Sequence, residues 1–108
     1  MSKILEQFVE INQLYRFYYP LLTEKQRSFI EYYYHQNYTL SEIAELERIS
    51  RNAVHDQLKR TVNKLYDFEH KINLLEKHKA RTKIIEALKD RSDKLKVNEL
   101  LEALEKVE

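Results

Sequence analysis

Polar side chains of the types that contact DNA are concentrated in the middle of this sequence. Arginine and lysine pair with phosphates and guanine, asparagine pairs with adenine, and a carboxylate accepts a hydrogen bond from the amino group of cytosine. The candidate nucleic-acid-binding residues are Ser41, Ser50, Arg51, Asn52, His55, Asp56, Lys59 and Arg60. Asp56 would repel phosphates, so contact to a cytosine is the role that suits it. The pattern predicts binding to double-stranded DNA.

Charge is distributed unevenly along the 108 residues, although the formal net charge is only +1. Residues 1–48 hold five Lys and Arg against seven Asp and Glu, residues 49–83 hold nine against four, and residues 84–108 hold five against seven. A Lys-rich solvated helix face would give the same counts. The basic segment contains most of the candidate DNA-contacting residues, however, and this position favours nucleic-acid binding.

Other kinds of chemistry find little support in the sequence. There is no cysteine and no glycine, which excludes thiolate metal sites and glycine-rich phosphate loops. The four histidines do not form a ligand pair on one helical turn. We therefore expect no enzymatic activity, no cofactor and no metal ion. Glu6 and Glu10 interrupt the apolar N-terminal segment, so we expect no signal peptide, no membrane insertion and a cytoplasmic location.

The composition predicts an all-α protein, because one proline and no glycine leave few helix breakers. The first predicted helix ends before Pro20 and carries an apolar stripe formed by Ile4, Phe8, Ile11, Tyr15 and Tyr18. Thr23 and Gln26 have the spacing of a capping box at the start of a second helix. A short third helix is predicted to begin at Ser41, which would cap it.

The segment 39–60 has the pattern of a helix-turn-helix. Such a motif needs a small residue where two helices cross, an apolar residue in the turn, and an apolar residue of the second helix that faces the first. Ala44, Ile49 and Val54 meet these requirements at intervals of five residues, and we expect them to be buried together. Ser50 is a good N-cap for the second motif helix.

The second motif helix is predicted to run to about residue 78, with a helical tail over 82–107, all within a single domain of 1–108. Its apolar stripe continues beyond the motif with a coiled-coil-like spacing and offers a dimer or partner seam formed by Leu65, Phe68, Ile72 and Leu75. Such a stripe must be covered. The chain's own tail or first helix would cover it in a monomer. A second copy would cover it in a homodimer, which we expect because paired motifs read two half-sites.

Three segments resemble known DNA-binding proteins, namely residues 22–27 (LTEKQR), 39–44 (TLSEIA) and 50–54 (SRNAV). They resemble the promoter-reading C-terminal domain of sigma-70-type factors, which implies a sigma-70 region-four-like helix-turn-helix of the winged-helix-like DNA-binding class. Nearly the whole chain is similar to the YlxM-like family of small bacterial proteins encoded beside the signal recognition particle GTPase. That resemblance implies a DNA-binding regulatory protein linked to signal recognition particle components.

The chain also departs from sigma-type proteins. Arg48 stands in the turn where they usually have glycine, so a non-glycine residue is expected in the left-handed conformation, at a cost of roughly 1 kcal/mol. Asn52 and His55 stand where sigma factors offer Glu and Arg to the bases. Because 108 residues leave no room for a promoter-melting domain, we expect no sigma-factor activity.

Two classes of function therefore remain open. The first is a DNA-binding regulator. The alternative is a protein-interaction adaptor that keeps the helix-turn-helix fold without sequence-specific DNA binding. The basic segment favours the regulator, whereas the near-zero net charge and Asp56 favour the adaptor.

Overall fold

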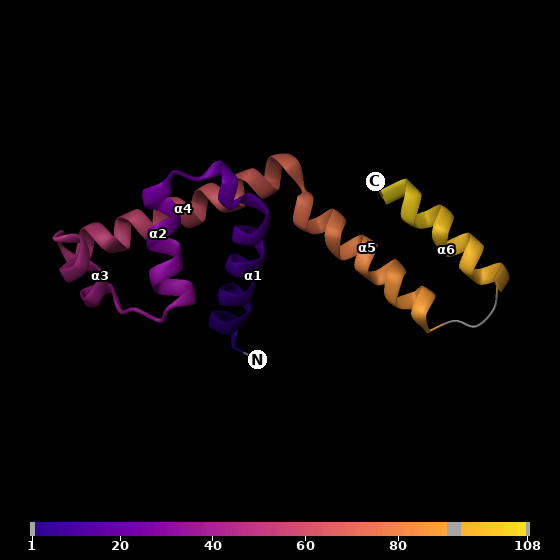
Figure 1. The fold of residues 1–108 in the computed structure, drawn as a ribbon, viewed down its shortest axis with the longest axis horizontal. Coiled ribbons are helices and arrows are strands. Elements are labelled where there is room, and N and C mark those ends of the chain that lie inside the picture. Colours follow the sequence, from indigo (N-terminus) through magenta and orange to yellow (C-terminus); the bar gives the residue numbers. More distant parts are fainter. Residues whose placement is uncertain (1, 91–93, 108) are drawn as a thin grey trace. The chain divides into compact units, whose positions relative to one another are not determined.

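The computed structural model describes residues 2–90 and 94–107. Within these residues the chain forms six α-helices and two short helical turns, and no strand (Figure 1). The elements are α1 (Lys3–Tyr18), η1 (Tyr19–Leu21), α2 (Glu24–Ile30), η2 (Glu31–His35), α3 (Leu40–Glu47), α4 (Arg51–Ile72), α5 (Leu74–Lys89) and α6 (Lys94–Val107). The predicted all-α fold is confirmed.

The chain is divided into two compact units, Met1–Ile72 and Asn73–Glu108. That both belong to a single domain of 1–108 stays a prediction. The prediction of one helix running to about residue 78 is wrong, because α4 ends at Ile72 and α5 begins at Leu74. Asn73 between them has φ 61° and ψ 30°, the left-handed conformation, which cannot continue a right-handed helix. Asparagine adopts this conformation more readily than most residues, but periodicity alone does not reveal it.

The helices of the first unit begin at side-chain caps. The predicted capping box of α2 is present, with the Gln26 N–H donating to the Thr23 hydroxyl at 3.1 Å and the Thr23 N–H donating to the Gln26 side chain at 2.9 Å. The helix α3 starts one residue earlier than predicted, and its cap is Thr39 in a second capping box with Glu42. The predicted cap Ser41 lies inside the first turn of α3 instead.

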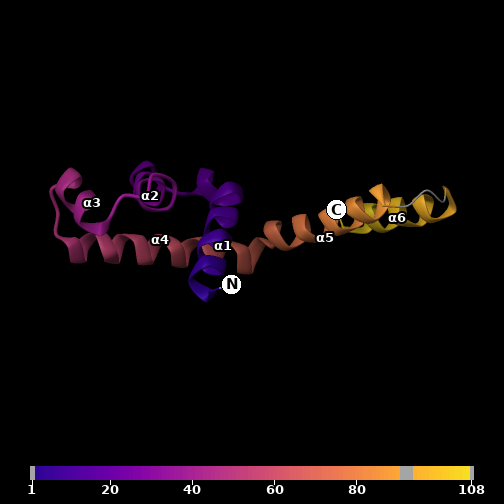
Figure 2. The ribbon, with the colours of Figure 1, turned by 90° about the horizontal axis from the view of Figure 1, so that it is seen from below.

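The core of the first unit forms where α1, α2 and α3 pack on α4. Its buried side chains are Ile11, Leu14, Tyr15, Tyr18, Leu22, Phe29, Ile30, Ile43, Val54, Leu58, Thr61 and Leu65. Two members of the predicted α1 stripe are not in this core, since Ile4 is 79% exposed and Phe8 is half-buried. Figure 2 shows that the N-terminal end of α1 extends past α4.

Three tyrosine–carboxylate hydrogen bonds hold α1 against its neighbours. The donor and acceptor residues are Tyr15 to Glu31, Tyr18 to Glu69 at 2.6 Å, and Tyr66 to Glu10 at 2.6 Å. Burial, together with the bonded carboxylate, raises the pKa of Tyr15 and of Tyr66. Each carboxylate accepts a charge-assisted hydrogen bond from a neutral phenol, which satisfies one of its acceptor sites at the helix contact.

The second unit consists of α5 and α6, which pack against each other. Leu75 is buried, whereas Ile85 and Leu101 are 40% and 44% exposed. Two helices alone cannot enclose a core, which is why most apolar side chains described in this unit are only half-buried. Across the described part of the chain, no helix combines the length and the hydrophobicity needed to cross a membrane.

Candidate nucleic-acid interface

The turn between α3 and α4 has the geometry that a helix-turn-helix requires. Arg48 follows α3 with φ 57° and ψ 44°, so the expected left-handed non-glycine residue is confirmed. The backbone N–H groups of Arg48 and Ile49 both donate to the Ala44 carbonyl, the second at 3.1 Å. These bonds end α3 with its last carbonyls partly satisfied and reverse the chain toward α4.

The apolar contact between the two motif helices differs in detail from the prediction. Val54 is fully buried as expected, but Ala44 and Ile49 are only half-buried. Ile43 provides the fully buried contact of α3 instead. Because successive helical positions point about 100° apart, α3 can direct only one of residues 43 and 44 squarely at the core, and it directs the larger one.

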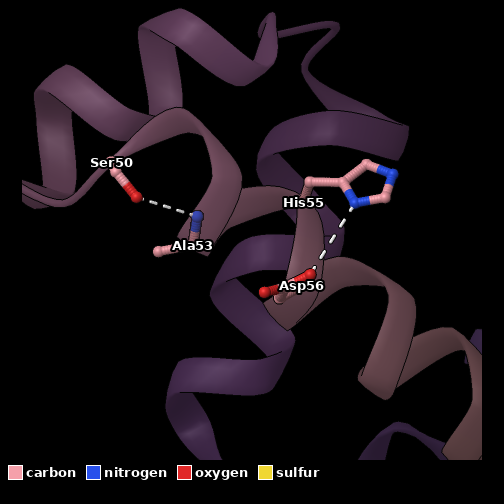
Figure 3. Close-up of polar contacts among 4 residues, drawn as sticks. All are labelled: Ser50, Ala53, His55 and Asp56. Atoms are coloured by element: carbon pink, nitrogen blue, oxygen red, sulfur yellow. Dashed lines mark hydrogen bonds and ion pairs between the residues drawn. The ribbon is translucent and has the colours of Figure 1, made fainter.

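Ser50 caps the N-terminal end of α4, as predicted. Its hydroxyl accepts from the Ala53 N–H at 3.0 Å (Figure 3), and its carbonyl accepts from the Val54 N–H at 3.1 Å. The hydroxyl proton of Ser50 can still be donated to a phosphate. The cap therefore fixes the first turn of α4 and keeps a donor at the N-terminal end of the helix.

The predicted contact residues of α4 all lie on its exposed sides. We call Arg51, Asn52, His55, Asp56, Lys59 and Arg60 the α4 polar face, and every one of them is exposed. Ser41 and Ser50 are exposed as well and lie near the N-terminal ends of α3 and α4, so the structure brings all eight candidates onto the two motif helices.

The interactions within the α4 polar face are weak. His55 Nδ1 lies 3.9 Å from Asp56 Oδ1, and the two side chains are 62% and 64% exposed (Figure 3). An ion pair of this length and exposure contributes little to stability. Both side chains therefore remain free to reorient toward a ligand, and three cations of the face outnumber its one carboxylate.

Sequence reasoning missed two parts of this surface. Asn63 is exposed one helical turn after Lys59, and the same four-residue spacing would have identified it. Tyr33 and Leu40 border hollows that also contact Arg51, His55 and Lys59. Tyr33 comes from η2 and Leu40 from the start of α3, so only the fold reveals that both border the same hollows as α4.

Two of the four predicted seam residues, Leu65 and Phe68, are packed within the first unit. Leu65 is fully buried within this chain, and the ring of Phe68 packs on that of Tyr18, 5.9 Å between centroids. The first helix thus covers this part of α4, one of the alternatives that the sequence left open. Ile72 is 40% exposed at the end of α4, and Leu75 is buried in the second unit.

Among the described residues, no group of three or more His, Asp or Glu side chains is placed to hold a metal ion. The arrangement is instead a short helix, a tight turn and a capped helix with an exposed polar face. These features define a helix-turn-helix protein.

Residues 5–106 match the family described as "Putative helix-turn-helix protein, YlxM / p13 like", and the chain belongs to this family. A UPF0122 protein of Geobacillus kaustophilus is 47% identical over 87 residues, covering 81% of this chain and 79% of the relative. One from Halalkalibacterium halodurans is 43% identical over 101 residues, covering 94% and 93%. The UPF0122 protein YlxM of Bacillus subtilis is 41% identical over 108 residues, covering 96% and 98%.

Proposed function

We propose that this protein is a regulator that binds double-stranded DNA and inserts the N-terminal half of α4 into the major groove. The observation that carries the proposal is the α4 polar face, six exposed side chains on a capped helix that follows a tight turn. Helix-turn-helix proteins contact bases with the N-terminal residues of this second motif helix. Membership of a family described by the same motif supports the assignment.

Each side chain of the face has a role that its chemistry suits. Arg51 and Lys59 pair with phosphates or with guanine, and Asn52 pairs with adenine. Arg60 contributes a further cation, His55 donates or accepts at a base edge, and Asp56 accepts from cytosine. Ser41 and Ser50 donate to phosphates from the N-terminal ends of the two motif helices, where the helix dipoles favour an anion.

A homodimer is part of this proposal, with the hairpin of the second unit as its contact. Ile85 and Leu101 are exposed on the described parts of α5 and α6. A second hairpin would cover these side chains as a further layer. Two motifs in one particle would read two half-sites, which compensates for the few bases that a single short helix reaches.

Selection from a random duplex library tests the proposal directly. The full chain should enrich a defined sequence, and that sequence should contain two related half-sites if the homodimer forms. Selected duplexes should bind far more tightly than a scrambled duplex of equal length at the same salt concentration. Failure to enrich any sequence at low salt would refute the DNA-binding proposal.

The alternative is an adaptor that binds protein through its apolar surfaces. The near-zero net charge, Asp56 on the α4 polar face and the exposed apolar side chains of the second unit favour it. The resemblance to proteins encoded beside the signal recognition particle GTPase makes components of that particle the first partners to test. Purified particle components that retain the chain, together with a failed duplex selection, would favour the adaptor.

A further inference from the structure

Two hollows adjoin one another beside the α4 polar face. One has a volume of about 320 Å³ and lies among α1, η2, α4 and Leu40. The other, of about 400 Å³, lies among Phe8, η2, the residues that follow it, and Arg51. Tyr33 and Leu40 border both hollows. We call the two hollows together the tyrosine groove, with Phe8, Tyr33 and Tyr34 on its aromatic side and Arg51, His55 and Lys59 on its polar side.

The aromatic side is built by an unusual turn. The Gln36 N–H donates to the Glu31 carbonyl at 2.9 Å, five residues back, which makes η2 a π-helical turn. Such turns occur often at functional sites. This one directs two consecutive tyrosines to the same groove, and the Tyr34 ring packs against Tyr33 and Phe8 at centroid distances of 5.0 and 4.9 Å. The cluster is therefore held in place while remaining only half-buried.

The polar side comes from one edge of α4. Arg51, His55 and Lys59 are spaced four residues apart, so they form a stripe along the helix. All three are exposed and line the groove. No Asp or Glu is among the described residues that line either hollow. Asp56 lies beside His55 but does not border the groove.

We propose that the tyrosine groove is a binding site for a small, planar aromatic anion. An aromatic ring would pack on the face or edge of Tyr33, and its negative group would pair with Lys59, His55 or Arg51. The hollows lie in the size range of small-molecule sites. Two kinds of compound share this chemistry, namely a mononucleotide and an aromatic carboxylate.

The regulatory consequence rests on the proposed function. Arg51, His55 and Lys59 belong to the α4 polar face as well as to the groove. An anion bound to them would occupy donors that DNA phosphates or bases need. Ligand and DNA would therefore compete, and the ligand would act as an effector that releases the protein from its operator.

Binding is tested with the ¹⁵N-labelled full chain and four probes: adenosine monophosphate, salicylate, adenosine and inorganic phosphate. One of the two aromatic anions should shift the amide resonances of Tyr33, Leu40 and Lys59 saturably, with an affinity at least about tenfold higher than that of adenosine or phosphate. The two aromatic probes distinguish the two kinds of compound. Absence of saturable shifts with both aromatic anions at millimolar concentration would overturn the proposal.

Three variants locate the site. Tyr33→Leu should weaken binding of the aromatic anion by about tenfold, since it keeps an apolar side chain and removes the ring. Tyr19→Leu is the matched control, because Tyr19 is exposed on η1 and borders neither hollow. Lys59→Gln changes an exposed side chain, and should weaken binding of the aromatic anion but not that of adenosine. If Tyr33→Leu and Lys59→Gln both bound the aromatic anion as tightly as the wild type, the assignment of the site would be overturned.

The probe titrations contain no DNA, so they succeed or fail independently of the proposed function. With a selected duplex, a saturating aromatic anion should lower the DNA affinity of the wild type and leave that of Tyr33→Leu nearly unchanged. DNA affinity that is unchanged by a bound anion would refute the competition. A chain that binds the anion but no duplex would refute the proposed function and leave the groove assignment supported.

Discussion

Two hydroxyl side chains at the start of α3 show how single residues fix this fold. Thr39 has extended backbone, and its hydroxyl accepts from the Glu42 N–H at 3.1 Å. In the second bond of the pair, the Glu42 carboxylate accepts from the Thr39 N–H at 2.9 Å. Ser41 cannot form such a pair, because Ala44 stands three residues later. The reciprocal bond therefore selects Thr39 over Ser41, although either residue is a good cap by type.

Replacement of Thr39 by Ala should lower the free energy of unfolding by about 1 kcal/mol, because it removes the cap of α3. Ser41→Ala is the matched control and should change it by no more than a few tenths of a kcal/mol. Urea unfolding followed by circular dichroism measures both. A larger loss from Ser41→Ala than from Thr39→Ala would show that Ser41 is the cap.

The contribution of Glu42 should depend on pH. Hydrogen bonds from the backbone and side chain of Thr39 hold the pKa of Glu42 below its ordinary value of 4.5. A carboxyl group with a lowered folded-state pKa stabilises the protein above its unfolded-state pKa, and this contribution is lost as pH falls through the lowered value. Glu42→Ala should therefore reduce the melting temperature more near pH 7 than near pH 3. An equal reduction at both pH values would contradict the assignment.

The contact between the motif helices rests on Ile43. Ile43→Ala should lower the free energy of unfolding by roughly 2–5 kcal/mol, since it leaves a cavity beside the fully buried Val54. Leu46→Ala makes a similar truncation on the same helix, at a side chain that is 52% exposed, and should cost far less. Equal losses in chemical denaturation would mean that α3 packs through a different face.

At the scale of the elements, left-handed residues and side-chain bonds decide where helices end and how they pack. Arg48 ends α3, and Asn73 separates α4 from α5. The Tyr–Glu hydrogen bonds of α1 join residues 16, 51 and 56 positions apart. None of these long-range pairs can be recognised from local periodicity, because a tyrosine or a glutamate at a helix surface has many candidate partners.

Glycine at position 48 should stabilise the turn. Arg48→Gly removes the Cβ that disfavours the left-handed conformation and should raise the free energy of unfolding by roughly 0.5–1 kcal/mol. Arg60→Gly places the same substitution in the middle of α4 and should lower it by about 1 kcal/mol. Thermal unfolding of both variants gives the signs, and a destabilising Arg48→Gly would contradict the role assigned to this turn.

Local signals predicted the motif better than they predicted its surroundings. The Thr23 and Ser50 caps, the left-handed Arg48 and the exposure of the α4 polar face followed from residue type and spacing. The end of α4 could not be predicted in this way, because the apolar spacing continues through Asn73 without interruption. The tyrosine groove was also missed, because η2 is joined to α4 only by tertiary packing and tyrosines at helical spacing are usually core.

At the scale of the whole molecule, two units divide the proposed tasks. The first, Met1–Ile72, contains the helix-turn-helix and the tyrosine groove. The second, Asn73–Glu108, offers exposed apolar side chains on a two-helix hairpin. DNA reading and effector binding would thus belong to one unit and self-association to the other, and each can be altered without touching the residues of the other.

A charge in the hairpin should separate the proposed dimer. Ile85→Glu would place a carboxylate in the contact between hairpins and should shift the sedimentation-equilibrium mass from dimer to the 13.2 kDa monomer. Ile4→Glu is the matched control, because Ile4 is exposed on the first unit, and it should leave the dimer intact. A wild type that sediments only as monomer, or a dimer that survives Ile85→Glu, would refute the proposed contact.

The salt dependence of DNA binding tests the central claim most directly. On a selected duplex, fluorescence anisotropy should show that Arg51→Ala and Lys59→Ala each weaken binding and reduce the slope of log Kd against log salt concentration by about one unit per lost phosphate contact. Lys25→Ala, an exposed cation on α2 outside the α4 polar face, should leave both quantities unchanged. If Arg51→Ala and Lys59→Ala both kept the affinity and the salt slope of the wild type, the assignment of α4 as the DNA-reading helix would be contradicted.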